Sequence, residues 1–276
     1  MIISINGKPI DITLDTEKNL GDVLQGIDMW ISPAGNRIRG ICVDGQSLQD
    51  DTLSGAFPRD VRDIKELDIA VSPWSELAAE ALETLLNTCE FYMNAQFDER
   101  TQIALDWENS AAARFLASEI PDMYDLAGRT LSGEGLSAPD LAILIAERLR
   151  EVSEPKQEIC AAGNLITNIA ERMEDLPLDI QTGKDQRAAE TIQLFARTTE
   201  KLFRIFFLLK SEWLSLDTLI IDNLPAKTFI EEFNSALKEL SSAYENRDTV
   251  LTGDIAEYEL APRMVKFYTA IKEIAR

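Results

Sequence analysis

The sequence contains no histidine among its 276 residues. Histidine carries the proton in Ser-His-Asp and Cys-His hydrolases. It also supplies ligands in HExxH zinc sites and in the Glu-x-x-His motif of di-iron helical bundles. The absence of histidine excludes these chemistries. It favours a protein without catalytic activity, although an enzyme that works with other side chains stays open.

Cysteine is scarce as well. Cys42, Cys89 and Cys160 are the only three, they are far apart, and none belongs to a CxxC pair. An odd number at wide spacing is not a disulfide framework, and the missing CxxC disfavours thiol redox chemistry and iron–sulfur ligation. We expect the cysteines to be small, buried apolar residues in a reducing compartment.

Phosphate-binding loops and long apolar runs are missing too. Neither GxxxxGK[ST] nor GxGxxG occurs, and in the short loop 132–135 the charge of Glu134 would repel a phosphate. The most apolar stretch, Leu202–Leu209, is interrupted by Arg204 and is far shorter than the roughly 18–20 residues of a membrane span. The first residues, MIISINGKPIDI, do not resemble a secretory signal. Together these features predict a cytoplasmic protein.

Acidic side chains are abundant. The chain has 27 basic and 48 acidic residues, a net charge of -21. Residues 1–72 hold 7 basic and 12 acidic side chains, and residues 73–276 hold 20 and 36. Nucleic acids and anionic membranes require a basic surface, so neither is an expected partner. The acidity predicts a protein partner with a basic surface, or it serves only to keep the protein soluble.

The N-terminal segment has the alternation of β-strands. Ile3 and Ile5 alternate on one side of Asn6-Gly7, Ile10 and Ile12 on the other, which is typical of a hairpin with a type I′ turn. Asn19 is a candidate N-cap for a short helix. The pattern then predicts a strand over 37–43, an irregular stretch around residue 58, and a last strand containing residues 67, 69 and 71.

This order of elements, over residues 1–72, resembles the ubiquitin-like β-grasp superfamily, which includes the small sulfur-carrier proteins. Carriers of this type end in an exposed Gly-Gly whose carboxylate is activated, whereas here the strand Asp68–Ser72 continues into a helix. The resemblance therefore implies an interaction module without carrier chemistry. Residues 73–276 resemble no family that we recognise.

The period changes to that of helices at Ser72-Pro73, which we predict to be the N-cap and first residue of a helix. Further helices are predicted over about 99–118 and 155–173, among others. Trp30 and Trp74 flank the β part, so we expect one of them to pack where two docked parts meet. The predicted fold is α+β: a β-grasp-like domain over 1–72, followed by an all-α helical bundle over 73–276.

The longest predicted helix spans about residues 184–216. Its apolar positions repeat at steps of four and three, which forms a heptad seam: Ala188, Ile192, Phe195, Thr199, Leu202, Phe206, Leu209, Trp213 and Leu216. Other apolar residues widen this surface, and such helices are usually buried in their own domain. We predict that this is the central helix of the bundle. A homodimer through the same seam is the alternative.

One acidic cluster precedes Pro262 and contains Asp254, Glu257 and Glu259. Asp254 and Glu257 are three residues apart and would share a helix face, so they are candidate metal ligands or members of a glycosidase-like pair. All three are candidates for binding a basic partner. A solvated helix face is the commoner outcome for such runs. Proline would kink or restart the helix here.

Three functions follow as hypotheses, and none requires a cofactor. The first is a non-catalytic protein-interaction module, either an adaptor, an assembly factor or a chaperone-like subunit, that binds a basic surface or an amphipathic helix. In composition the chain is similar to the acidic, helix-rich chaperones of bacterial secretion and flagellar assembly. The second is a small-ligand binder or enzyme that uses carboxylates, tyrosines and lysines in a helical pocket. The third is a homodimeric structural protein built on the 188–216 helix.

Overall fold

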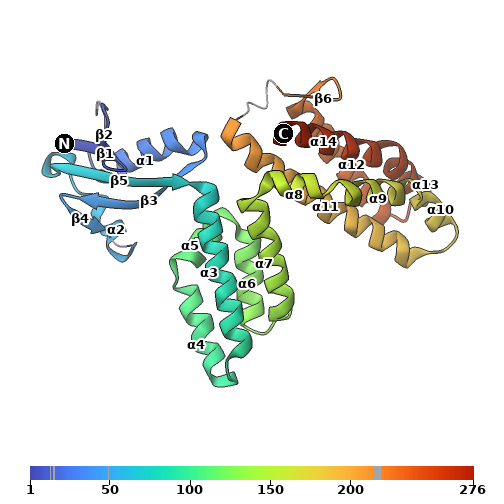
Figure 1. Cartoon of the computed structure of the whole chain (residues 1–276), viewed down its shortest axis with the longest axis horizontal. Helices are drawn as coiled ribbons and strands as arrows, with labels where there is room; N and C mark the ends of the chain where they lie inside the picture. The colour runs from blue at the N-terminus through green and yellow to red at the C-terminus, as the bar shows by residue number, and fades with distance from the viewer. Residues whose placement is uncertain (13, 15, 49, 214–218) are drawn as a thin grey trace. The chain divides into compact units, whose positions relative to one another are not determined.

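The computed structural model describes the chain except for residues 13, 15, 49 and 214–218. The chain forms two compact units, Met1–Leu149 and Arg150–Arg276. The first unit combines a five-stranded sheet with helices, and the second is helical apart from one short strand pair (Figure 1). The predicted α+β fold with a helical bundle is therefore confirmed.

The sheet is mixed and lies at the N-terminus. Its strands are β1 Ile2–Ile5, β2 Lys8–Pro9, β3 Asn36–Val43, β4 Gln46–Leu48 and β5 Glu66–Pro73. They are arranged in the order β2-β1-β5-β3-β4, and only the β1–β5 pair is parallel. Helix α1, Leu20–Ile31, packs its apolar face on strand residues such as Ile3, Leu67 and Ile69 to form the core.

The turns and the helix cap of this region follow the sequence closely. Asn6 and Gly7 have φ angles of 51° and 72°, the left-handed backbone that was expected there, and Asp44 and Gly45 form a second such turn with φ angles of 51° and 80°. The Asn19 side chain accepts a hydrogen bond from the Asp22 N–H at 2.9 Å and caps α1. A helix α2, Asp50–Ala56, and a 3₁₀ turn, Val61–Asp63, fill the irregular stretch.

The start of the next helix differs from the prediction. Ser72 pairs with Arg37, and Pro73 pairs with Asn36, so both residues belong to β5. The predicted cap at Ser72 is wrong because sheet pairing holds this residue in an extended conformation, and α3 begins at Trp74. The expected division after residue 72 thus lies within one residue of the change from sheet to helix, whereas the two compact units divide after Leu149.

The first unit continues with α3 Trp74–Asn94, α4 Phe97–Glu108, α5 Ala111–Glu119, α6 Pro121–Leu131 and α7 Ala138–Ser153, the last of which runs on into the second unit. The single helix predicted over 99–118 is in fact α4 and α5. Asn109 ends α4, and the Ser110 hydroxyl caps α5 by accepting a hydrogen bond from the Ala113 N–H at 3.0 Å.

The second unit contains α8 Pro155–Ala161, α9 Gly163–Glu174, α10 Leu176–Gln181, α11 Asp185–Trp213, β6 Ile220–Ile221, β7 Leu224–Pro225, α12 Ala226–Glu245, α13 Thr249–Asp254, the π-helical segment η3 Ile255–Leu260, and α14 Ala261–Ala275. The helix predicted over 155–173 divides at Ala162. Gly163 follows, and a Cβ at this position would lie 2.9 Å from the Tyr268 hydroxyl, so any larger residue would require the Tyr268 side chain to shift. Among the residues that the structure describes, no helix is long and apolar enough to cross a membrane.

Helix α11 is the longest that the structure describes, and its seam is largely buried. It packs against α8, α9, α10 and α14. The buried seam residues are Ala188, Phe195, Thr199, Leu202, Phe206 and Leu209. Ile192 is half-buried, the helix ends at Trp213, and Leu216 lies outside the described residues. The seam therefore serves the core of its own unit, and a homodimer through residues 188–216 stays a prediction.

Pro262 is accommodated by a change of helix type. The Ala261 N–H donates to the carbonyl of Ala256, five residues back, at the end of η3. Pro262, which has no N–H to donate, then lies in the first turn of α14, where a helix leaves its N–H groups free in any case. The sequence predicted either a kink or a restart of the helix at this proline. The structure shows a restart, after a π-helical turn.

Candidate functional site

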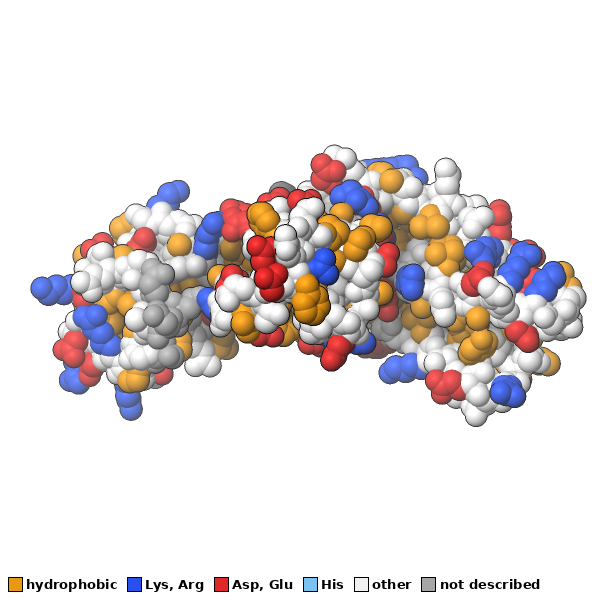
Figure 2. Space-filling model, turned by 90° about the horizontal axis from the view of Figure 1, so that it is seen from below, with side chains coloured by type: hydrophobic (Ala, Val, Ile, Leu, Met, Phe, Trp, Pro, Cys, Tyr) orange, Lys and Arg blue, Asp and Glu red, His pale blue; other side chains and the backbone are white. Residues whose placement is uncertain are grey.

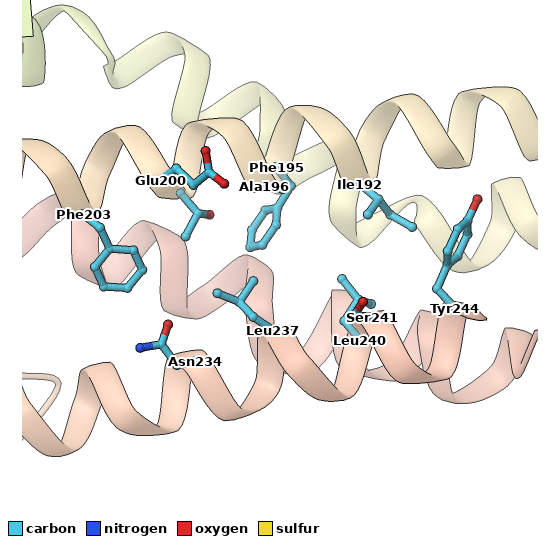
Figure 3. Close-up of a pocket in the computed structure, with 11 residues that line it drawn as sticks. Ile192, Phe195, Ala196, Glu200, Phe203, Asn234, Leu237, Leu240, Ser241 and Tyr244 are labelled. Atoms are coloured by element: carbon cyan, nitrogen blue, oxygen red, sulfur yellow. The ribbon is translucent and has the colours of Figure 1, made fainter. Parts of the chain in front are cut away.

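A groove between α11 and α12 is a candidate site in the second unit. It has a volume of about 370 Å³. One wall is formed by Ile192, Phe195, Ala196, Thr199, Glu200 and Phe203 of α11. The other wall is formed by Asn234, Leu237, Leu240, Ser241 and Tyr244 of α12. Ile192 faces Tyr244 at one end and Phe203 faces Asn234 at the other, so the two helices run antiparallel (Figure 3).

Small side chains contribute to both walls of the groove. Ala196 on α11 and Ser241 on α12 line it, and both are exposed. Larger side chains at these two positions would fill the space. Deeper in the unit, the rings of Phe195 and Phe203 lie 6.5 Å and 5.7 Å from that of Phe233 on α12, at spacings typical of packed aromatic pairs. The groove therefore has an apolar, aromatic base.

The polar side chains of the groove are spread along its length. Asn234, Ser241 and Tyr244 follow one another along α12, and Glu200 lies on the opposite wall (Figure 3). The Glu200 carboxylate is mostly exposed and lies 3.9 Å from Arg204. The Thr199 hydroxyl, by contrast, is buried and has no hydrogen-bond partner. This arrangement suits an extended contact rather than a reaction at one point.

The predicted acidic cluster lies outside this groove. Asp254 is exposed at the end of α13, while Glu257 and Glu259 are half-buried in η3. Glu259 accepts a hydrogen bond from Arg263 at 2.9 Å. Glu257 accepts a hydrogen bond from the Tyr258 phenol and thereby raises the pKa of that phenol.

Among the residues that the structure describes, no third ligand joins Asp254 and Glu257 to complete a metal site. Within the described part of the chain, no three Asp, Glu or Cys side chains are grouped so that they could hold an ion. Three carboxylates on one short segment could still attract a basic partner. Binding by Asp254, Glu257 and Glu259 therefore stays a prediction that the structure leaves open.

Sequence reasoning also missed a buried network of charges on α11. Arg204, noted only as an interruption of an apolar run, donates two hydrogen bonds of 2.8 Å and 2.9 Å to Glu151, whose side chain is buried. Lys201 donates to Glu158 at 2.7 Å. Burial raises the pKa of Glu158, but the hydrogen bond and charge of Lys201, together with Arg150, outweigh it and hold the pKa below its usual value. The network joins α11 to α8 and to the end of α7.

The groove itself was missed because its residues have the spacing of a core. Ile192, Phe195 and Thr199 belong to the predicted seam, and Leu237 and Tyr244 to the apolar face of the following helix. Apolar periodicity shows which residues face another element, but it does not show how far away that element lies. The one feature of the sequence that could have indicated the groove is Thr199, a polar residue in the middle of the apolar seam.

Two parts of the chain match family models. Residues 1–73, which end with the last strand of the sheet, match the TP0873 N-terminal domain. Residues 159–270 match a domain of unknown function, DUF8042, and this range includes both walls of the groove. No curated protein and no solved structure matches the chain. The chain is therefore similar to these two domains over separate ranges, each shorter than half its length.

Proposed function

We propose that the chain is a non-catalytic protein-interaction module that binds an amphipathic helix of a partner in the groove between α11 and α12. The observation that carries this proposal is the groove itself, an open apolar channel between two antiparallel helices. A helix that inserts apolar side chains at positions i, i+3, i+4 and i+7 is a common way to fill such a channel. Adaptors, assembly factors and chaperones all use it.

The dimensions of the groove support a helical occupant. Its α11 wall runs from Ile192 to Phe203. At about 1.5 Å per residue this distance is roughly 16 Å, or about three turns of an α-helix. A third helix laid between α11 and α12 would place its apolar stripe on Phe195 and Leu240, which together with Thr199 form the buried part of the lining.

The charges of the chain indicate which side chains the partner helix carries beside its apolar stripe. Of the lining residues that the structure describes, Glu200 alone carries a formal charge, and the whole chain has a net charge of -21. On the face shown in Figure 2, acidic and basic side chains are interspersed with hydrophobic ones. A partner with lysine or arginine beside its apolar stripe would be attracted electrostatically and would place a cation near Glu200. We therefore propose a protein partner, not nucleic acid or membrane, and a cytoplasmic location.

A small apolar ligand is the second candidate. The volume of the groove lies in the range of roughly 300–1,000 Å³ that is usual for ligand pockets, and five of its lining residues are polar. Two observations favour the helix instead. The polar groups are spread along the groove (Figure 3), and a cluster of phenylalanines fills the core beneath it.

For residues 1–72 we propose a ubiquitin-like β-grasp module. The strand order β2-β1-β5-β3-β4, with its parallel pair β1–β5 and with α1 on one face, supports this kinship. Because β5 leads directly into α3, the module would serve in binding and not as a carrier. An experimental structure with a different strand order would refute the assignment.

The helix-binding proposal is tested with a designed peptide of about 20 residues, long enough to form a helix, with a leucine stripe and lysines beside it. Fluorescence anisotropy of the labelled peptide should show saturable binding that weakens with added salt. Ala196→Arg would fill the groove and should weaken binding at least about tenfold. Gln193→Arg adds the same side chain to an exposed position of α11 outside the groove and should not weaken it. Absent binding, or equal loss in both variants, would refute the proposal.

A further inference from the structure

Thr199 is a polar residue at a position where the groove is otherwise apolar. Its side chain lines the groove and is only 2% exposed. One turn away on either side along α11 lie Phe195 and Phe203, which also line the groove. Its hydroxyl has no hydrogen-bond partner. A buried hydroxyl without a partner is uncommon in proteins and calls for an explanation.

Several other helical threonines of this chain satisfy their hydroxyls locally, although the buried hydroxyl of Thr130 in α6, like that of Thr199, has no partner. Thr191 donates to the Arg187 carbonyl at 2.8 Å, and Thr252 donates to the Asp248 carbonyl at 2.6 Å. Thr269 donates to the Val265 carbonyl at 2.8 Å. This bond to the carbonyl four residues back is the usual local partner of a helical threonine. Thr199 makes no such bond, so both the donor and the acceptor of its buried hydroxyl are left for a group that packs against this residue from the groove.

The unpartnered hydroxyl of Thr199 determines which side chain of an occupant can pack against it favourably. An entirely apolar helix would leave the buried hydroxyl without a partner, as it already is in the chain alone, which is unfavourable. A charged side chain at this depth would lose its hydration. An uncharged side chain that both donates and accepts hydrogen bonds, such as that of serine, threonine, asparagine or glutamine, avoids both costs.

We propose that Thr199 is a specificity-determining residue of the groove and selects a partner helix with one uncharged polar side chain in the middle of its apolar stripe. This inference rests on the proposed function, because it assumes a helical occupant. Thr199 lies between the two ends of the groove, which are marked by Ile192 and Phe203. A polar pair at this place would also fix the register of the docked helix, as a single buried asparagine does in coiled coils.

The test compares two designed peptides of about 20 residues that share a leucine stripe and flanking lysines. They differ at the central position of the stripe, which is asparagine in one and leucine in the other. The wild-type chain should bind the asparagine peptide about tenfold more tightly. Thr199→Val, which keeps the shape and removes the hydroxyl, should abolish or reverse this preference.

Thr191→Val is the matched control, because Thr191 is equally buried on the same helix but does not line the groove. It should leave the preference unchanged. Thr199→Ser keeps the hydroxyl and should keep the preference, which covers the case in which valine disturbs folding. Equal preference in the wild type and Thr199→Val would overturn this inference alone. Failure of both peptides to bind the wild type would overturn the proposed function together with it.

Discussion

The indole N–H of Trp74 donates a hydrogen bond of 2.8 Å to the Glu119 carboxylate, which links the start of α3 to the end of α5. Arg37 of β3 donates to the same carboxylate at 3.2 Å. The Trp74 ring also lies 6.5 Å from that of Phe115. Sheet and helices thus meet at Glu119. Of the two tryptophans expected at such a junction, Trp74 occupies it, whereas Trp30 is 63% exposed.

Glu119→Ala should destabilise the first unit by about 1–3 kcal/mol, because Trp74 and Arg37 would both lose the acceptor that they share. Glu119→Gln should have a smaller effect, since an amide oxygen can still accept from the indole. Glu83→Ala, at an exposed position of α3, is the control and should change stability by less than about 0.5 kcal/mol. Urea unfolding followed by tryptophan fluorescence measures the difference. Equal effects of Glu119→Ala and Glu83→Ala would show that the junction contributes nothing.

The N-terminal sheet was largely predictable because its signals are local. Asn6-Gly7 and Asp44-Gly45 each specify a turn through residues that tolerate positive φ, and Asn19 caps α1 within three residues of itself. The helix breaks at Ser110 and Gly163 were missed. The first depends on a cap inside an apolar pattern, and at the second Gly163 leaves room for the Tyr268 hydroxyl, which comes from a distant part of the chain.

The groove was beyond prediction for a different reason. A pattern of apolar residues places Phe195 and Leu240 on inward faces, but the separation of α11 and α12 results from packing against other helices. The small side chains of Ala196 and Ser241 matter only because the fold brings both to the same groove, and nothing near either in sequence indicates the other.

Arg204→Ala should destabilise the second unit strongly, because it leaves the buried Glu151 carboxylate without its bidentate partner. Removing one member of such a pair costs about 3 kcal/mol or more, which for a unit of this size lowers the melting temperature by roughly 10 °C. Arg204→Lys should restore only part of the loss, since lysine cannot form the two parallel bonds.

Arg197→Ala is the control for this experiment, because Arg197 is exposed on the same helix. Thermal unfolding followed by circular dichroism should show almost no change for this variant. An Arg204→Ala chain that melts within a few degrees of the wild type would show that the Arg204–Glu151 pair is dispensable for stability.

Glu158 should make the second unit less stable in acid. The pKa of its carboxyl is lower in the folded chain than the ordinary value of 4.5, chiefly because Lys201 offsets the effect of burial. The carboxylate therefore contributes stability above pH 4.5, and this contribution is lost as the pH falls through the folded-state pKa.

Melting temperatures of the wild type and Glu158→Gln, measured against pH, check this expectation. The advantage of the wild type should be largest near neutral pH and should shrink as the pH falls below 4.5. Glu154→Gln, at an exposed position beside it, should follow the wild type throughout. An advantage that is constant across the acid range would contradict the assignment.

The cysteines should differ in reactivity. Cys89 is buried, and burial raises the pKa of its thiol to about 11, so little reactive thiolate forms at neutral pH. Cys160 is exposed. Brief treatment of the native protein with iodoacetamide, followed by peptide mass spectrometry, should therefore find Cys160 modified and Cys89 protected until the chain is unfolded. Fast labelling of Cys89 in the native protein would contradict the packing of α3.

The central claim, that the groove between α11 and α12 receives a helix, is tested most directly by methyl NMR of the isotope-labelled chain during titration with the lysine-flanked leucine peptide. The account predicts saturable shifts of the methyl signals of Ile192, Leu237 and Leu240, which line the groove. Leu178, which is 57% exposed on α10 and does not line the groove, should not shift. Shifts centred on Leu178, or none in the groove at saturating peptide, would contradict the account.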